Sequence, residues 1–177
     1  MSDLRFYERE LTEDEITILA GNNVSDVIIA KDQTLNGKID LKADKEIVLE
    51  ACKNNGTALY YASKDLQDDK DLILEIIEHE WIAFAYASDR LKSDRDVIMK
   101  AVKEDGYALN YIMDESLLDD REIIFEAVKQ GNFRIYHIHN QFKDDKDIVL
   151  AMIKKNIDSF YFVSDRLKND RDVCLEA

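Results

Sequence analysis

The segment Asp94-Arg95-Asp96-Val97-Ile98-Met99-Lys100-Ala101-Val102, followed by Gly106-Tyr107-Ala108-Leu109, decides the fold because the chain repeats its pattern. Each copy opens with an aspartate, a basic residue and a second acid, and then continues with apolar residues. The opening residues are Asp44, Asp69, Asp94, Asp120, Asp145 and Asp170. They lie 25, 25, 26, 25 and 25 residues apart. A fixed period of this length indicates a repeat architecture.

The composition favours helices. Hydrophobic residues make up 46% and charged residues 35% of the 177 residues, so the chain can bury a core. It contains no proline and 5 glycines, which fits helices better than a turn-rich β fold. We therefore predict an all-α, right-handed solenoid of about five short helix-pair repeats of 25 residues.

The period also predicts how the chain is organised. Full copies span 44–68, 69–93, 94–119, 120–144 and 145–169, and a partial copy spans 170–177. Residues 1–43 do not match the repeat. There, a capping box at Thr12–Glu15 and the stretch Val24–Ala30 predict a degenerate pair of helices that covers the open end of the stack. The last copy has no polar closing helix, which leaves two alternatives open: its helix ends the protein or pairs with a second copy, or further repeats follow.

The first helix of each repeat is predicted from its cap and its apolar arc. The residue before the opening aspartate is a strong N-cap type in five copies, and the second acid, three positions later, suits a capping box. These cap residues are Asp68, Ser93, Asp119, Asp144 and Asn169. Apolar residues such as Val97, Ile98 and Met99 cover an arc of about 200°, wider than the stripe of a surface helix. We expect this helix to be buried on two sides by neighbouring repeats.

A second, shorter helix is expected after a turn. Asn55-Gly56, Asp105-Gly106 and Gly131-Asn132 suit a left-handed C-terminal cap of the first helix. The second helix then runs, for example, over Tyr107–Glu115. Its inward residues are expected to be Ala58, Leu59 and Tyr61 in one copy, Ala83, Phe84 and Tyr86 in the next, and Ala108, Leu109 and Tyr111 in the third.

The net charge and the cysteines limit the cellular environment and the kind of partner expected for this chain. The net charge of −14 repels nucleic acid and anionic membranes and favours a partner with a basic surface. No apolar run approaches the ~18 residues of a membrane span, and Met1–Arg5 lacks the features of a signal peptide. Cys52 and Cys174 both fall at apolar repeat positions, so we expect two buried thiols. Together these features predict a cytoplasmic protein.

The pattern resembles a known family. Gly56-Thr57-Ala58-Leu59-Tyr60-Tyr61-Ala62-Ser63, within Lys45–Leu66, is similar to the repeat catalogued as domain of unknown function 4116. The resemblance extends over residues 44–177 and weakens at 120–142, where Arg134–His139 replaces the Ala-Leu-x-Tyr-Ala-Ser core. It implies tandem helical repeats of unassigned function, and it supplies no catalytic residues.

The sequence does not predict an enzyme or a cofactor. His137 and His139 are two residues apart, so on a helix they point about 200° apart and do not share a metal ion. There is no glycine-rich phosphate loop and no Gly-x-Ser-x-Gly motif. The recurring basic residues follow one aspartate and precede another acid, so we expect them to form ion pairs between repeats rather than a phosphate-binding track. They are Lys45, Lys70, Arg95, Arg121, Lys146 and Arg171.

Binding residues of a solenoid are expected at positions that vary between copies and point outward. The turn between the two helices and the outer face of the second helix meet this description. The candidates are Trp81, Tyr107, Phe133, Tyr60, Tyr136, Tyr161, Glu80, Glu104 and Asp105. Trp81 replaces a glycine, and it is either a plug against the next repeat or an exposed anchor, because aromatic residues are common hot spots.

We therefore expect a non-enzymatic module for protein–protein interaction. The alternative is a small acidic inhibitor that mimics the charge of nucleic acid and blocks a basic nucleic-acid-binding protein. A mimic needs its acids concentrated on one face and loses affinity steeply as salt rises.

Overall fold

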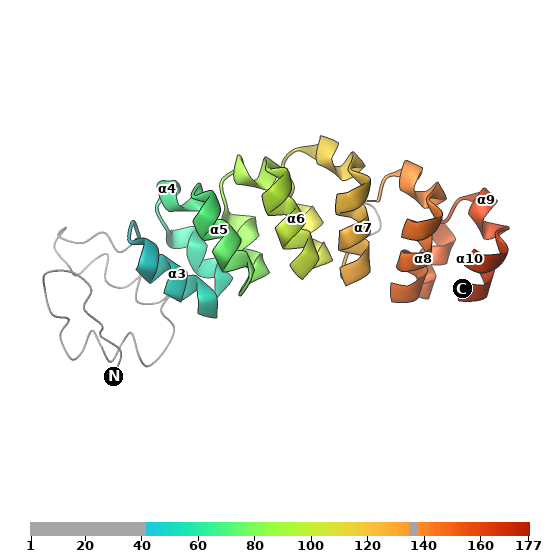
Figure 1. Ribbon diagram of the computed structural model, residues 1–177, viewed down its shortest axis with the longest axis horizontal. Helices are drawn as coiled ribbons and strands as arrows, with labels where there is room; N and C mark the ends of the chain where they lie inside the picture. Colours follow the sequence, from blue (N-terminus) through green and yellow to red (C-terminus); the bar gives the residue numbers. More distant parts are fainter. Residues whose placement is uncertain (1–41, 135–137) are drawn as a thin grey trace, which may run out of the picture.

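The computed structural model describes residues 42–134 and 138–177, and within these ranges it contains helices and no strand (Figure 1). The long α-helices lie side by side, in chain order, along the long axis of the molecule. They are α3 (Lys45–Asn54), α5 (Lys70–Ile77), α6 (Arg95–Glu104), α7 (Arg121–Gln130), α8 (Lys146–Lys155) and α10 (Arg171–Glu176). The all-α class is confirmed. The handedness and the number of repeats stay predictions, and the helices predicted within 1–43 lie almost entirely outside the described residues.

The second element of each repeat differs from the prediction, because it is a 3-10 helix of six residues. These helices, which we call the 3-10 layer, are η1 (Gly56–Tyr61), η2 (Trp81–Tyr86), η4 (Gly106–Tyr111) and η8 (Ile157–Phe162). A third, short helix follows. These edge turns are α4 (Lys64–Gln67), η3 (Leu91–Ser93), η5 (Glu115–Asp119), η7 (Asn140–Asp144) and α9 (Asp165–Lys168). A repeat is therefore three elements rather than a pair, and residues 131–134 form no helix where the fourth copy of the layer is expected.

The N-caps lie one residue later than predicted. Asp120 Oδ1 accepts hydrogen bonds from the backbone N–H groups of Glu122 and Ile123, at 2.9 and 3.4 Å. The opening aspartate is the N-cap in every described copy. The second acid is therefore the second residue of the helix, which is too early for a capping box but still within the first turn, where the helix dipole favours negative charge.

The core confirms the predicted burial of the α-helices on two sides. Val97, Ile98 and Val102 of α6 are each 0% exposed. Complete burial of such a side chain contributes roughly 1.5–3 kcal/mol. One apolar cluster extends from α3 to α8, and a smaller one joins α8 to α9 and α10. Helix α8 contributes to both because its opposite sides pack on α7 and α10.

The glycines after α3 and α6 serve close packing, not a left-handed cap as predicted. A Cβ atom on Gly106 would lie 2.4 Å from the backbone oxygens of Ala127 and Gly131, and one on Gly56 would lie 2.8 Å from Ile82 Cγ2. The preceding residues, Asn55 and Asp105, are extended, with φ of −157° and −152°. Positive φ occurs only after α7 among the described residues, at 82° for Gly131 and 53° for Asn132.

A ladder of ion pairs joins each repeat to the next, as predicted. Arg121 Nε donates to Asp145 Oδ2 at 2.6 Å, and Lys45 Nζ donates to Asp69 Oδ2 at 2.6 Å. The same contact links Lys70 to Asp94, Arg95 to Asp120 and Lys146 to Asp170. In Asp120 and Asp145, Oδ1 caps its own helix and Oδ2 accepts from the cation of the preceding repeat, and in Asp145 the capping oxygen also accepts from Arg121 Nη2.

Three of the five residues first predicted as caps form a second set of contacts between repeats. Asp68 accepts hydrogen bonds from the Ser88 hydroxyl and from Arg90 Nε. Both interactions hold the pKa of Asp68 below its ordinary value, with the Ser88 bond the larger cause. Asp144 is bound in the same way by Ser164 and Arg166. Asp119 contacts His139 Nδ1 at 2.7 Å and accepts from Gln141 Nε2 at 2.8 Å.

The two cysteines differ, which corrects the expectation that both are buried. Cys52 is 0% exposed, and burial raises the pKa of its thiol to about 12. Cys174 is exposed, because α10 packs only on α8 and α9. The prediction treated the last copy as if a further repeat covered it.

Candidate functional site: an aromatic row on the 3-10 layer

The local sequence explains why the second element is short and rigid. Asp105 ends α6 and also caps η4, because its Oδ1 accepts from the Tyr107 N–H at 2.7 Å. Asn55 does the same for η1, where it accepts from Thr57 N–H at 3.1 Å. In a helix with three residues per turn, side chains three positions apart are eclipsed. Gly56, Leu59 and Ala62 therefore form one buried column, and the tyrosines lie on other faces.

Six aromatic side chains from η1, η2 and η4 form what we call the aromatic row. Its members are Tyr60, Tyr61, Trp81, Tyr86, Tyr107 and Tyr111. In the first two repeats, the ring centroid of Tyr60 lies 5.0 Å from that of Tyr61 and 5.9 Å from that of Tyr86, both edge to face. Such pairs contribute about 0.5–1.5 kcal/mol beyond their buried area. The row is therefore a packed surface and not a set of independent side chains.

Trp81, Tyr107 and Tyr111 form a triangle across the next junction. The ring centroid of Trp81 lies 6.2 Å from that of Tyr107 and 6.5 Å from that of Tyr111, and the two tyrosine centroids are 6.1 Å apart. Burial raises the pKa of Tyr111, and the hydroxyls of Tyr107 and Tyr86 raise it further. Trp81 is partly buried against the next repeat and partly accessible, so it combines the two alternatives considered for it.

The segment after α7 closes one end of the row. Arg134 Nη2 donates to the Tyr107 hydroxyl at 2.6 Å, and its guanidinium carbon lies 5.1 Å from the centre of the Tyr107 ring. Asn132 Nδ2 donates to both carboxylate oxygens of Asp105 at 3.0 Å. These contacts fasten the irregular segment 131–134 to η4 and add a cation to the edge of the aromatic surface.

The structure brings together only part of the predicted site. Tyr60, Trp81 and Tyr107 belong to the row, and Glu80 directly precedes Trp81. Glu104 is exposed at the end of α6. Asp105 caps η4 and accepts from Asn132, so its carboxylate is engaged within the fold.

The remaining candidates lie elsewhere. Phe133 lines a separate hollow. Tyr161 is 78% exposed and makes no ring contact with another described aromatic residue. Tyr136 lies outside the described residues. Tyr61, Tyr86 and Tyr111 were expected to face inward and also belong to the row. Tyr86 and Tyr111 are partly buried and pack against the core, as expected, whereas Tyr61 is 38% exposed, which corrects the expectation for that copy.

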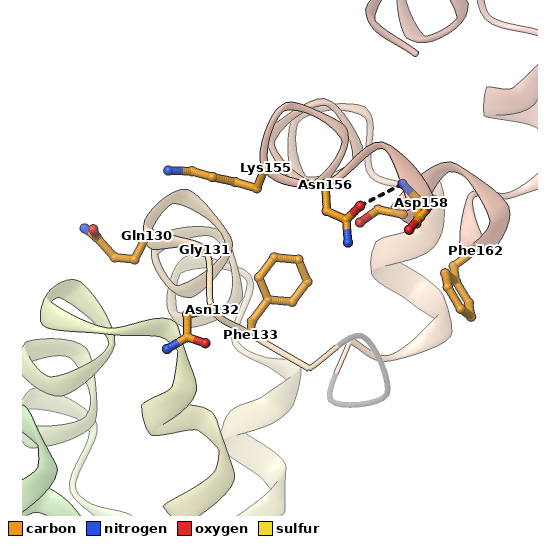
Figure 2. Close-up of a pocket in the computed structure, with 9 residues that line it drawn as sticks. Gln130, Gly131, Asn132, Phe133, Lys155, Asn156, Asp158 and Phe162 are labelled. Atoms are coloured by element: carbon orange, nitrogen blue, oxygen red, sulfur yellow. Dashed lines mark hydrogen bonds between the residues drawn. The ribbon is translucent and has the colours of Figure 1, made fainter.

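Two depressions flank the row. A groove of about 490 Å³ lies beside Tyr60 and Tyr86 and is also lined by Lys64, Gln67 and Lys92. The second is a hollow of about 580 Å³ between the end of α7 and η8. Figure 2 shows Phe133 pointing from the end of α7 toward Asn156 across this hollow.

Within residues 42–134 and 138–177, no three His, Cys, Asp or Glu side chains lie close enough to hold a metal ion. In the same ranges, no helix has the length and apolar character needed to cross a bilayer. The lowered pKa values of carboxylates such as Asp68 and Asp120 are explained mainly by hydrogen bonds and ion pairs between repeats.

Comparison with known proteins identifies the repeats. The family model described as Domain of unknown function (DUF4116) matches residues 38–67, 69–118, 120–167 and 145–177. The chain belongs to the DUF4116 family. No curated protein and no solved structure matches it significantly. The DUF4116 pattern thus corresponds to an α-helix, a 3-10 helix and an edge turn, with the aromatic row on three consecutive copies.

Proposed function

We propose that this DUF4116 chain is a non-enzymatic module that binds another protein through the aromatic row. The observation that supports the proposal most directly is the row itself: six aromatic side chains on three consecutive repeats, partly accessible and packed ring against ring. Tyrosine and tryptophan are the residues most enriched at binding hot spots, since they supply a large contact area with few rotatable bonds.

The repeat scaffold supports the same proposal. The 3-10 layer packs against the α-helices, so its aromatic side chains are held in place before a partner arrives, and preorganisation lowers the entropic cost of binding. The exposed fractions of 63% for Tyr60 and 38% for Tyr61 leave contact area for a partner. The net charge of −14 favours a partner with a basic surface.

The distribution of acids gives no support to the alternative of a nucleic-acid mimic. In the described residues, the opening aspartates from Asp69 onward pair with cations of the preceding repeat. A mimic instead requires acids that are concentrated on one face and available to a basic partner.

The proposal is tested by crosslinking from defined positions in the host cell. A photoreactive p-benzoylphenylalanine replaces Tyr60 in one variant and Tyr161 in a matched control. Both positions are exposed tyrosines of the 3-10 layer, but only Tyr60 belongs to the row. We expect one partner protein to crosslink at position 60 and not at position 161.

The identified partner is then tested with purified proteins. Binding should persist at about 1 M salt, where the screening length falls to about 3 Å. It should be lost in Trp81→Ala and retained in Tyr161→Ala. Equal crosslinking at both positions contradicts the proposal. So does a partner that is bound only at low salt and is displaced by DNA or RNA, which is the behaviour of a mimic.

A further inference from the structure

We propose that the aromatic row receives an arginine side chain of its partner, with the guanidinium against Trp81 and Tyr111 and paired with the carboxylate of Glu80. This inference rests on the proposed function, because it specifies the chemistry that the same row recognises. Three features of the structure support it: the triangle of rings, a guanidinium already bound at its edge, and the carboxylate of Glu80, which directly precedes Trp81 in the chain and has no partner among the described residues.

The first feature is the geometry of the triangle. The planes of the Trp81 and Tyr107 rings meet at 63°, those of Trp81 and Tyr111 at 46°, and those of Tyr107 and Tyr111 at 62°. The rings are therefore inclined to one another instead of being stacked flat. With centroids 6.1–6.5 Å apart, one cation above the triangle can lie within the roughly 6 Å over which a ring attracts it, for more than one ring at once.

The second feature is Arg134, which shows that the row accommodates this chemistry. Its guanidinium carbon is 5.1 Å from the centre of the Tyr107 ring, and its Nη2 donates to the Tyr107 hydroxyl at 2.6 Å. A planar guanidinium can make both contacts together, whereas a lysine ammonium has no plane to stack. Among the described cations, none is stacked on Trp81 or Tyr111, so these two rings remain for a partner.

The third feature is Glu80, at the position before the 3-10 helix. Asn55, Asp105 and Asn156 occupy the equivalent positions, and each accepts a hydrogen bond from a backbone N–H of its 3-10 helix. Glu80 makes no such bond. Its carboxylate has no ion pair or hydrogen bond with any described residue, although the residue is partly buried. A guanidinium on the adjacent Trp81 ring would give it a charge-assisted partner.

Together these features favour arginine over other partner chemistries. A carboxylate beside aromatic rings repels an anionic side chain, and the overall charge of −14 adds to that repulsion. An apolar side chain would leave Glu80 unpaired under the bound partner, which is unfavourable. An arginine guanidinium can stack on the rings and pair with the carboxylate at the same time.

Trp81 provides the test, because it is the single tryptophan of the chain and its fluorescence reports directly on the triangle. The full-length protein is titrated with N-acetyl-argininamide and, separately, with N-acetyl-lysinamide, at constant ionic strength. We expect a saturable change in Trp81 emission with an apparent Kd about threefold or more lower for the arginine compound, in line with a stacked guanidinium.

A matched pair of variants separates the specific carboxylate from the general charge. Glu80→Gln should raise the Kd for N-acetyl-argininamide by about threefold or more. Glu115→Gln makes the same change in net charge at an exposed residue of η5, outside the row, and should leave that Kd within about twofold. Neither carboxylate is bonded in the described fold, so both variants should keep the far-ultraviolet circular dichroism of the parent.

Equal affinities for the two compounds, or equal effects of the two variants, would overturn the inference. These failures are distinguishable from failure of the proposed function. If crosslinking at position 60 identifies a partner but the arginine preference is absent, the row binds protein through different chemistry. If no partner crosslinks at position 60, the proposed function itself fails.

Discussion

The ion-pair ladder and the aromatic row are built on the same repeats, but the ladder recurs at every junction whereas only part of the row does. The ladder recurs at five consecutive junctions, with an Arg or Lys and an Asp each time. The row combines a tyrosine that recurs at positions 61, 86 and 111 with positions that change, since Tyr60 in one copy corresponds to Ala85 and Asn110 in the next two. A contact that every junction needs is repeated, whereas a surface specific to one partner is expected to differ along the stack. On the proposed function, the changing positions Tyr60, Trp81 and Tyr107 are therefore the ones expected to determine the partner.

The largest effect on stability is expected at Gly106, where η4 packs closely against the end of α7. Gly106→Ala should lower the free energy of unfolding by about 2–3 kcal/mol, because its Cβ meets two backbone oxygens that cannot turn away. Gly56→Ala should cost less, about 1–2 kcal/mol, since its contacts are longer: 2.8 Å to the Ile82 side chain and 2.9 Å to the backbone nitrogen of Ala83. Urea unfolding measures both. An unchanged or increased stability of Gly106→Ala would show that close packing is not the reason for the glycine.

Acid should weaken the ladder and not the row. Hydrogen bonds from Arg95 and Arg121 lower the pKa values of Asp120 and Asp145 in the folded protein. A lowered folded-state pKa contributes stability that is present above the unfolded value of about 3.9 and is lost as the pH falls through the folded value. We therefore expect the midpoint of urea unfolding to be flat near neutral pH and to fall below about pH 4. In Arg121→Gln this decline should be shallower, and an identical pH profile would contradict the assignment.

A single ladder cation should contribute little. Its side chain is about half exposed, as with Arg95 at 45%, so Arg95→Gln should cost less than about 1 kcal/mol at low salt and still less at 1 M salt. Arg171→Gln is the matched control, because Arg171 forms no ion pair with a described residue. It should have no measurable effect. A cost above about 2 kcal/mol for Arg95→Gln would mean that the ladder, rather than the core, sets the stability.

The smallest change in stability is expected in the row. Tyr60 is 63% exposed, so Tyr60→Ser should change the free energy of unfolding by no more than about 0.5 kcal/mol. The same substitution should abolish or strongly weaken partner binding if the comparison between the ladder and the row is right. The two measurements are made on one preparation, by urea unfolding and by a binding titration with the crosslinked partner. Loss of stability together with binding would assign Tyr60 to the fold.

Much of the fold was predictable because the repeat period of the sequence shows which residues occupy equivalent positions in successive helices. The buried residues of the α-helices and the ion pairs between repeats were predicted correctly, since each depends on a pattern that recurs. The N-cap was misplaced because Asp68 and Asp69, like Asp119 and Asp120, are adjacent and both suit a cap. The first copy distinguishes the two positions, since Ala43 has no side-chain oxygen to cap a helix and Asp44 has one.

The 3-10 helices were harder to predict, and with them the row. Asn55 and Ser63 are both caps and lie eight residues apart, which leaves room for only a short turn between them. The expectation that these tyrosines face inward holds for Tyr86 and Tyr111, which are partly buried against the core, and fails for Tyr61, which is 38% exposed. Contacts between repeats, such as those of Trp81 with Tyr107 and Tyr111, depend on how neighbouring copies pack, and no local pattern contains that information.

The double use of the opening aspartate has a consequence for how such chains change in length. Asp120 and Asp145 each cap their own helix with one oxygen and receive the preceding repeat with the other. Each of these units thus carries an aspartate that binds the cation of the unit before it and a cation that binds the aspartate of the unit after it. Duplication or deletion of a whole 25-residue unit again places a cation beside an opening aspartate at the new junction. This ion pair is therefore kept without a compensating mutation when the array is lengthened or shortened in evolution.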